Sequence, residues 1–497
     1  MNINILEFLE KTVLHYPDKI AVKHNEDGIS FTELRNKALY IGEVLEEYNF
    51  KNEPIAVFMP KSINAITALL GVIYSGNIFF SLDVDSPRER NKSILSKIQP
   101  KIILTNNKLF EEAKAYESND IVILNIEEFD YSLQNQLKVF IPQNIDTDPL
   151  YIVNTSGSTG HPKGVLISHG AMISFLNASN RVVQTGPDDV IGNQAPFTFD
   201  IAISDMFIAF MTGATLLLID RINFSFPIKL IQILNENRVT YIRWVASALV
   251  IVSNAKLIDK INSGLKYVMI SGEKIPQNHL QNWLNNSTAD FFNCYGPTEC
   301  TAYSVVYKFQ RDDELDKSMP IGRSLYNKAV FLLNEKNSLI TKSNVIGEIC
   351  IKGSCVSLGY WNDREKTEEV FIQNPLQNNY REIIYKTGDL AYYNEEGDLV
   401  FQSRKDYQIK HMGYRIELTE IEAAVNADEL IENCCVVYND DKQEIRLFYS
   451  GKIDISDLLS KLKAKIPAYM IPAKVKKLDK MPVNQNGKLD RKQLSEV

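Results

Sequence analysis

Short apolar runs alternate with helical patterns over about the first 310 residues, and this alternation constrains the fold more than any other feature. We predict helices over Phe31–Leu45 and Ile63–Tyr74, separated by a strand over Pro54–Met59. Further strands are predicted over Asn77–Leu82, Lys101–Leu104, Tyr151–Val153, Leu216–Ile219, Tyr241–Val245 and Tyr267–Ile270. Chains with this rhythm form α/β layers around mostly parallel sheets.

The pattern changes after residue 320. Short alternating strands such as Gly347–Lys352 and Leu399–Gln402 lie between Gly, Asn and Pro turns, which favours an antiparallel sheet or a small barrel. The C-terminal part has its own α+β pattern, with helices predicted over Leu418–Asn426 and Ile455–Lys465 and strands over Cys434–Tyr438 and Glu444–Tyr449. A joint near Ser403–Asp406 leads us to expect domains at residues 1–403 and 404–497.

The composition indicates a globular protein with more than one domain. The chain has 497 residues, 45% of them hydrophobic and 23% charged, so it can bury a large core and should split into at least two domains. The net charge of −8, without a local block of Lys and Arg, argues against a nucleic-acid partner.

Targeting and redox signals point to the cytoplasm. The N-terminal residues lack the basic region and apolar stretch of a signal peptide, and the longest apolar runs are too short to cross a membrane. The six cysteines and six histidines are scattered and match neither a disulfide framework nor a zinc pattern. We therefore expect a cytoplasmic protein without a membrane partner.

The most informative stretch is TSGSTGHPKG at residues 155–164. It follows an apolar strand, and we expect an apolar helix to start after it. Glycines let the backbone approach an anion, hydroxyls and amides donate hydrogen bonds to phosphate oxygens, and Lys163 adds a positive charge. The loop lacks the Gly-Lys-Ser/Thr ending of a Walker A motif. A flexible Gly/Ser linker is the alternative, but it would not lie between two apolar elements.

Four more motifs follow in order: NCYGPTE at 293–299, YKTGDL at 385–390, SRKDYQIK at 403–410 leading to GYRIE at 413–417, and NQNGK at 484–488. With the loop at 155–164, they make the chain resemble the adenylate-forming enzymes almost end to end. That group includes nonribosomal-peptide adenylation domains, acyl-CoA synthetases and firefly luciferase. The resemblance implies a large N-terminal domain of two α/β layered subdomains plus a small β-barrel-like subdomain, followed by a small mobile α+β domain.

The resemblance implies ATP and Mg²⁺ as cofactors. It implies that Tyr295 stacks on adenine, Thr298 contacts the α-phosphate, Glu299 helps to hold Mg²⁺, and Asp389 accepts hydrogen bonds from the ribose hydroxyls with help from Arg404. The full set implied to bind the nucleotide is Thr155, Ser156, Gly157, Ser158, Thr159, Gly160, Lys163, Gly272, Glu273, Asn293, Tyr295, Gly296, Asp389 and Arg404. Ser403 stands where the family usually has Gly, which affects the local backbone and not the chemistry.

Lys488 is the implied catalytic residue, together with Thr298 and Glu299. In the family this lysine bridges the substrate carboxylate and phosphate oxygens and stabilises charge as it redistributes. Outside that context, a Lys in an Asn-Gly turn would be a solvated surface charge. Asp406 matches the family's hinge, about which the small domain rotates to present the Gly413 region for thiolation.

An amino acid, unlike a fatty or aryl acid, needs a partner for its ammonium group. Asp200 aligns with the aspartate that pairs with the α-ammonium in amino-acid-activating members, and a helix N-cap before Ile201 is the alternative. By the same alignment, the other pocket residues are Ile201, Ser204, Arg243, Met269, Ser271, Cys294, Ala302 and Tyr303.

Arg243 suggests an acidic substrate. An arginine stays charged and must find an anion when buried, so a second carboxylate on the substrate is one partner. Pairing with Asp205 is the alternative. Residues 193–200 also resemble D-alanyl carrier protein ligases, but Ser271 stands where those enzymes have Cys, and Arg243 where they have a small polar residue.

We expect an amino acid–carrier protein ligase that forms AMP. Because nine residues follow Lys488, we expect a free-standing enzyme that meets the phosphopantetheine arm of its carrier protein in trans. A D-alanine–carrier protein ligase, a carboxylic acid–coenzyme A ligase and a non-catalytic scaffold on this fold are the alternatives. The sequence does not identify the amino acid, its chirality, the carrier protein, the pathway or the oligomeric state.

Overall fold

The structure is a computed structural model, and it describes residues 2–132, 141–157, 162–262, 264–313, 319–440, 442–482 and 489–495. The chain divides into two compact units. The first comprises residues 1–82, 99–153 and 164–405, and the second comprises residues 83–98, 154–163 and 406–497. One boundary falls between Lys405 and Asp406, near the predicted joint. The second unit also takes in two segments from earlier in the chain, so the division into 1–403 and 404–497 stays a prediction.

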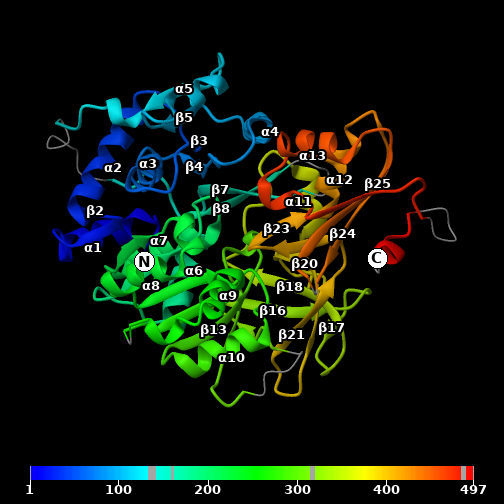
Figure 1. The fold of residues 1–497 in the computed structure, drawn as a ribbon. Helices are drawn as coiled ribbons and strands as arrows, with labels where there is room; N and C mark the ends of the chain where they lie inside the picture. Colours follow the sequence, from blue (N-terminus) through cyan, green and yellow to red (C-terminus); the bar gives the residue numbers. More distant parts are fainter. Residues whose placement is uncertain are drawn as a thin grey trace. The chain divides into compact units, whose positions relative to one another are not determined.

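A nine-stranded sheet in the first unit has the strand order β15-β14-β13-β12-β11-β9-β10-β1-β2. Figure 1 labels two of its strands, β2 and β13. Its strands are β1 Ile20–His24, β2 Asp27–Ser30, β9 Val190–Asn193, β10 Thr215–Leu218, β11 Tyr241–Val245, β12 Tyr267–Ser271, β13 Asp290–Tyr295, β14 Val305–Lys308 and β15 Arg323–Ser324. The six strands from β13 to β1 are parallel, and the strands at both edges are antiparallel.

A second sheet has the order β6-β5-β3-β4-β7-β8 and is parallel from β6 to β7. Its strands are β3 Pro54–Val57, β4 Ile78–Ser81, β5 Ile102–Thr105, β6 Val122–Asn125, β7 Pro149–Thr155 and β8 Lys163–Ser168. The helices of the first unit are α1 Leu6–His15, α2 Phe31–Glu46, α3 Ile63–Tyr74, α5 Phe110–Ala113, α6 His169–Val182, α7 Asp200–Thr212, α8 Pro227–Glu236, α9 Ala246–Asn254, α10 Gln277–Asn286 and α11 Arg364–Val370. The predicted strand–helix alternation is therefore confirmed.

The antiparallel region predicted after residue 320 is a six-stranded sheet, with the order β17-β16-β18-β20-β19 and β21 paired to β20. Its strands are β16 Lys328–Leu333, β17 Leu339–Ile340, β18 Gly347–Gly353, β19 Phe371–Gln373, β20 Ile383–Tyr393 and β21 Leu399–Arg404.

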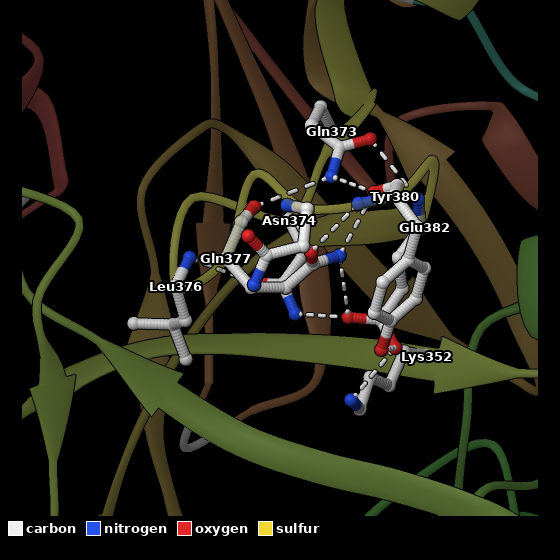
Figure 2. Close-up of polar contacts among 8 residues, drawn as sticks. Lys352, Gln373, Asn374, Leu376, Gln377, Tyr380 and Glu382 are labelled. Carbon is white, nitrogen blue, oxygen red and sulfur yellow. Dashed lines mark hydrogen bonds and ion pairs between the residues drawn. The ribbon is translucent and has the colours of Figure 1, made fainter.

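The loop between β19 and β20 is ordered by its own polar side chains (Figure 2). Glu382 accepts hydrogen bonds from Lys352 Nζ at 2.8 Å and Asn374 Nδ2 at 2.5 Å. Gln373 Nε2 donates to the backbone oxygen of Tyr380 at 3.0 Å, and the backbone amide of Tyr380 donates to Gln377 Oε1 at 3.3 Å. These contacts satisfy backbone groups that a loop leaves unpaired.

The second unit has a small α+β core. Helices α12 Leu418–Asn426 and α13 Ile455–Lys463 share one hydrophobic cluster with the three-stranded sheet of β24 Ile431–Asn439, β25 Glu444–Gly451 and β26 Lys474–Lys477. The remaining elements are the hairpin of β22 Gln408–His411 and β23 Tyr414–Glu417, and helices α4 Arg88–Ile98 and α14 Arg491–Ser495. None of the helices in the described ranges is long and apolar enough to span a bilayer.

Helices α2 and α3 pack closely because glycines face the opposing helix. A Cβ added at Gly71 would lie 2.6 Å from Cβ of Ile41 and 3.1 Å from the backbone oxygen of Ala38. Real side chains do not tolerate such a separation, so the glycine sets the distance between the two helices.

We expect Gly71→Ala to destabilise the first unit by about 1–3 kcal/mol through overpacking. Helix propensity alone predicts the opposite sign, a gain of roughly 1 kcal/mol. The control is Gly186→Ala, because a Cβ at Gly186 has nothing within 4 Å. Urea and thermal unfolding measure both variants, and a Gly71→Ala protein as stable as the wild type would contradict this packing argument.

Candidate functional site

The predicted amino-acid pocket lies at the carboxyl ends of parallel strands of the nine-stranded sheet, where open α/β sheets usually bind ligands. Arg243 on β11 is in register with Met269 on β12, and Ser271 on β12 with Cys294 on β13. Helix α7 and the loop after β13 supply the other members, which are Asp200, Ile201, Ser204, Ala302 and Tyr303. The structure thus brings these residues together from four separate segments of the first unit.

Asp200 is a buried carboxylate at the first position of α7. It accepts hydrogen bonds from the Thr298 side chain and from the backbone amides of Ile201 and Ala302. Burial raises the pKa of Asp200, although these hydrogen bonds and the charge of Arg243 act against the rise. The N-cap alternative is wrong, because Phe199 is the N-cap residue. A buried carboxylate that desolvation destabilises is suited to bind a cation.

Arg243 pairs with Asp205, which is the alternative to a substrate carboxylate. Nη2 of Arg243 lies 2.6 Å from Asp205 Oδ1, and both side chains are buried. The same nitrogen donates to the backbone oxygen of Ile201 at 2.9 Å and to Ser204 Oγ. Burial acts to lower the pKa of Arg243, but Asp205 and the neighbouring Tyr241 and Tyr303 raise it above its ordinary value. The structure therefore shows the pairing with Asp205 that was the alternative to a substrate carboxylate.

The loop at 300–304 carries two pocket residues in an unusual backbone conformation. Thr301 has φ 57° and Ala302 has φ 58°, the left-handed region that β-branched residues rarely adopt. Lys328 Nζ donates to the backbone oxygens of Cys300, Thr301 and Tyr303, at 2.8, 3.1 and 2.7 Å. Lys328 is buried, and its amino group donates to three carbonyls that this conformation turns inward.

Gly296 lets this loop approach the end of β13. A Cβ at Gly296 would lie 2.5 Å from Cα of Tyr303 and 2.6 Å from the backbone oxygen of Ala302. Any side chain at this position would push the loop away from the strand. The predicted role of Gly296 in nucleotide binding stays a prediction, but its packing role is clear.

Three predicted nucleotide-binding residues form a second cluster. Tyr295 Oη and Nη1 of Arg404 both donate to the carboxylate of Asp389, and Nη2 of Arg404 donates to the backbone oxygen of Thr387 at 3.3 Å. The backbone amide of Asp389 donates to Thr387 Oγ1 at 3.0 Å. These contacts fix the position of the Asp389 carboxyl group, whose oxygens are suitable acceptors for ribose hydroxyls.

The other predicted nucleotide residues of the first unit make structural contacts. Asn293 Nδ2 donates to the backbone oxygen of Pro320 at 2.9 Å. Glu273 Oε2 accepts from the backbone amide of Ser247 at 3.2 Å, in the first turn of α9, and Gly272 has φ 86°. Gly272 and Glu273 thus follow the carboxyl end of β12, and Asn293 lies near the carboxyl end of β13, at the side of the sheet where the pocket is predicted.

Glu299, the predicted Mg²⁺ ligand, is fully buried and accepts a hydrogen bond from Tyr360 Oη at 2.8 Å. Within the described ranges, no group of three or more His, Cys, Asp and Glu side chains could hold a metal ion. Mg²⁺ commonly uses one or two carboxylates and completes its shell with phosphate oxygens and water, so a single glutamate fits this ion and not a preformed metal centre.

The phosphate loop belongs to the second unit, and the residues at both its ends are described. Ser156 Oγ donates to the backbone oxygen of Arg415 at 2.8 Å, and the backbone amide of Gly157 donates to Glu420. Thr155 Oγ1 donates to the backbone oxygen of Lys163 at 3.5 Å. Strand β8 follows the loop, and α6 begins only at His169, so the expectation of a helix directly after the loop is wrong.

Several predicted residues lie outside the described ranges. They are Ser158, Thr159, Gly160 and the catalytic candidate Lys488, whose predicted roles stay predictions. Asp406 is the first residue of the last segment of the second unit, and its Oδ1 accepts from the backbone amide of Gln408 at 3.2 Å. Its role as a hinge also stays a prediction.

Lys61 and Lys328 are residues that the sequence analysis missed. Lys61 Nζ donates to the backbone oxygens of Gln194 at 2.9 Å and Ile219 at 2.6 Å, and so joins the ends of β9 and β10. Burial lowers the pKa of Lys61 to about 7. Neither lysine lies in a recognisable motif, and a lysine is usually solvated, so only tertiary structure identifies them.

The sequence matches the family described as AMP-binding enzyme over residues 9–361 and the AMP-binding enzyme C-terminal domain over residues 420–488. It is 32% identical over 502 residues to bacitracin synthase 1 of Bacillus licheniformis, and 30% identical over 500 residues to tyrocidine synthase 1 of Brevibacillus parabrevis. These alignments cover 100% and 99% of this chain but only 9% and 45% of the relatives. Zwittermicin A synthase ZmaJ of Bacillus cereus is 29% identical over 508 residues, covering 100% of this chain and 95% of that protein.

Solved structures share the fold. The Vibrio cholerae adenylation domain AlmE, in complex with glycyl-adenosine-5′-phosphate, has a TM-score of 0.86 at 19% identity and covers 100% of this chain and 98% of that chain. Holo-PA1221, an NRPS protein with adenylation and PCP domains, has a TM-score of 0.84 at 23% identity and covers 99% and 84% of the two chains.

We expect the single substitution Arg243→Met to lower the free energy of unfolding by about 3–5 kcal/mol, because it leaves the Asp205 carboxylate buried without its partner. The double variant Arg243→Met/Asp205→Leu should regain most of this loss, since it removes both charges and keeps the volume.

The loss in Arg243→Met should also depend on pH. Burial raises the pKa of Asp205 and Arg243 lowers it, so the pKa of Asp205 should be higher in the variant than in the wild type. The deficit is therefore complete above the pKa of Asp205 in the variant and shrinks as the pH falls from that value to the wild-type pKa. Urea unfolding at several pH values measures both effects. A single variant as stable as the double variant at neutral pH would contradict a buried ion pair.

Proposed function

This chain belongs to the family of AMP-binding enzymes, and from that premise we propose that it uses ATP to convert an amino acid into an aminoacyl adenylate. The phosphopantetheine thiol of a separate carrier protein, which the enzyme meets in trans, then attacks the acyl carbon; the thioester bond forms as the acyl–oxygen bond breaks, and AMP leaves. The observation that carries the proposal is Asp200, a buried carboxylate at the pocket edge whose charge the surrounding protein compensates only in part.

In the first step, a carboxylate oxygen of the amino acid attacks the α-phosphorus of ATP. The new oxygen–phosphorus bond forms as the bond to the bridging oxygen breaks, and the electron pair leaves with pyrophosphate. We assign Asp200 to the ammonium group of the substrate, which fixes its carboxylate for in-line attack. Asp389, Tyr295 and Arg404 hold the nucleoside, and Lys488 stabilises the developing charge.

The phosphate loop and Glu299 complete the nucleotide site in this proposal. Thr155, Ser156, Gly157 and Lys163 provide hydroxyl, amide and ammonium donors for phosphate oxygens. Ser156 and Gly157 exchange their contacts with Arg415 and Glu420 for contacts with ATP. Glu299 would hold Mg²⁺, which neutralises phosphate charge when bound.

Exchange of radiolabelled pyrophosphate into ATP tests the adenylation step. We expect amino-acid-dependent exchange, and we expect Lys488→Ala to lower kcat roughly 10²- to 10³-fold because it removes a group that stabilises transition-state charge. Lys480→Ala is the matched control, because Lys480 is an exposed lysine of the same unit. Exchange that is absent with every amino acid tested, or that Lys488→Ala leaves unchanged, would refute the mechanism.

The thiol acceptor is tested with the same enzyme. The enzyme is given a phosphopantetheinylated carrier protein and free coenzyme A at equal thiol concentration. We expect more aminoacyl carrier protein than aminoacyl-coenzyme A. A dominant aminoacyl-coenzyme A product would replace the carrier-protein proposal with a coenzyme A ligase.

The pH dependence tests Asp200. Only the ionised carboxylate attracts an ammonium group, and burial raises the pKa of Asp200 above the ordinary range of an aspartate. The KM for the amino acid should therefore rise as the pH falls through that raised pKa, which gives an acid limb in kcat/KM. Asp200→Asn should raise KM at all pH values and abolish the limb. A limb of the same position in the variant would assign it to another group.

A further inference from the structure

Two rows of side chains face the amino-acid pocket from the parallel strands β11, β12 and β13. Ser271 and Cys294 are in register and form the row nearest the carboxyl ends. Arg243, Met269 and Phe292 are in register with one another and form the next row, two residues deeper. Side chains two residues apart on a strand point to the same face about 6.5 Å apart, so the second row lies directly beneath the first.

The exposed fraction of the side chains falls from the first row to the second. Four residues near the mouth keep some exposure: Asp200 6%, Ser271 5%, Cys294 5% and Ala302 6%. The deeper row is less exposed, with Met269 at 0%, Arg243 at 1% and Phe292 at 3%, and Ser204 on the facing helix is at 0%. The deeper residues therefore form a floor.

Charge and hydrogen bonds fix this floor in place. The Arg243–Asp205 pair joins strand β11 to helix α7 at 2.6 Å. On the neighbouring wall, the hydroxyl groups of Tyr303 and Ser179 are hydrogen bonded at 2.8 Å. The rings of Tyr303 and Phe175 pack edge to face, with their centroids 5.1 Å apart. These side chains cannot withdraw without breaking buried polar contacts, and this makes the floor rigid.

Nε and Nη1 of Arg243 have no hydrogen-bond partner among the described residues, which raises the question of a substrate oxygen as their acceptor. Less than 1 Å² of either atom is exposed, so a ligand in the open part of the pocket does not reach them. An acidic side chain would also meet the carboxylate of Asp205, which already neutralises Arg243. The pocket therefore offers an acidic substrate no net positive charge.

We propose that the enzyme activates amino acids with a short, uncharged side chain of no more than about two carbon atoms, since a longer one would meet the second row of the sheet. The inference rests on the proposed function and specifies the substrate class of the same site. The Arg243–Asp205 pair acts as a specificity determinant by filling the pocket, and not by binding a substrate carboxylate.

The first test is pyrophosphate exchange by the full chain with glycine, both enantiomers of alanine and of 2-aminobutyrate, serine, valine, leucine, phenylalanine, aspartate, glutamate, asparagine and glutamine. We expect the highest kcat/KM among glycine, alanine and 2-aminobutyrate, with a loss of roughly 10- to 200-fold for each further methylene. The highest kcat/KM with an acidic, amide or long side chain overturns the inference and leaves the proposed function intact. Exchange with none of these amino acids overturns both.

Two matched double variants separate volume from charge. Arg243→Ala/Asp205→Ala opens the floor, and we expect the kcat/KM ratio of leucine to alanine to rise at least about 10-fold. Arg243→Met/Asp205→Leu removes the same charges but keeps the volume, so the order of preference should stay that of the wild type. A shift of equal size in both variants would show that charge sets the preference, which contradicts the inference. Thermal unfolding checks that both variants fold, and the wild-type panel decides the question if the opened variant does not.

Discussion

One buried ammonium group holds the part of the first unit on which the candidate amino-acid pocket depends. Lys328 lies at the start of β16 and donates to three backbone oxygens of the loop at 300–304. That loop supplies the Ala302 amide to Asp200 and the Tyr303 ring to the wall of the pocket. Antiparallel and parallel sheets of the first unit are thereby joined at the site, and the loss of this cation would leave three carbonyls buried without donors.

The buried carboxyl groups of Asp205 and Asp200 have different partners. The charge of the Asp205 carboxylate is neutralised within the protein by Arg243, whose Nη2 lies 2.6 Å from Oδ1. Asp200 instead accepts hydrogen bonds from the Thr298 side chain and from the backbone amides of Ile201 and Ala302, and burial raises the pKa of both carboxyl groups. An ion pair formed within the protein fills space in the pocket, whereas a buried carboxylate that is only partly compensated can bind a cation. By this contrast, the Arg243–Asp205 pair belongs to the floor of the proposed pocket, and Asp200 is the proposed partner of the substrate ammonium group.

Most of the fold follows from local sequence patterns. The helix predicted over Ile63–Tyr74 and the strand predicted over Tyr241–Val245 have the observed bounds, because apolar periodicity and burial agree there. The strand β8 after the phosphate loop was not predicted, since a Gly/Ser-rich loop between apolar runs does not show which element follows. The pairing partner of Arg243 could not be chosen from sequence either. Asp205 and Arg243 are 38 residues apart, and only the packing of α7 on the sheet brings them together.

The motifs located the candidate site, but not the groups that support it. Tyr295, Asp389 and Arg404 come from three motifs and meet at one carboxylate. Lys61 and Lys328 lie in no motif, and Lys328 is buried and Lys61 half-buried, whereas lysine is usually exposed. A sequence pattern reports residues that share a local geometry. Donors that reach across sheets to backbone oxygens leave no such pattern.

The left-handed backbone of Thr301 and Ala302 has a consequence for ligand affinity. Two consecutive residues other than glycine in this region cost conformational energy, which the fold supplies before any ligand arrives. The loop is therefore already ordered, and an incoming amino acid does not lose binding free energy to the entropy of ordering it. Because folding has already ordered the loop, a small ligand with few contacts can still be held in a defined orientation.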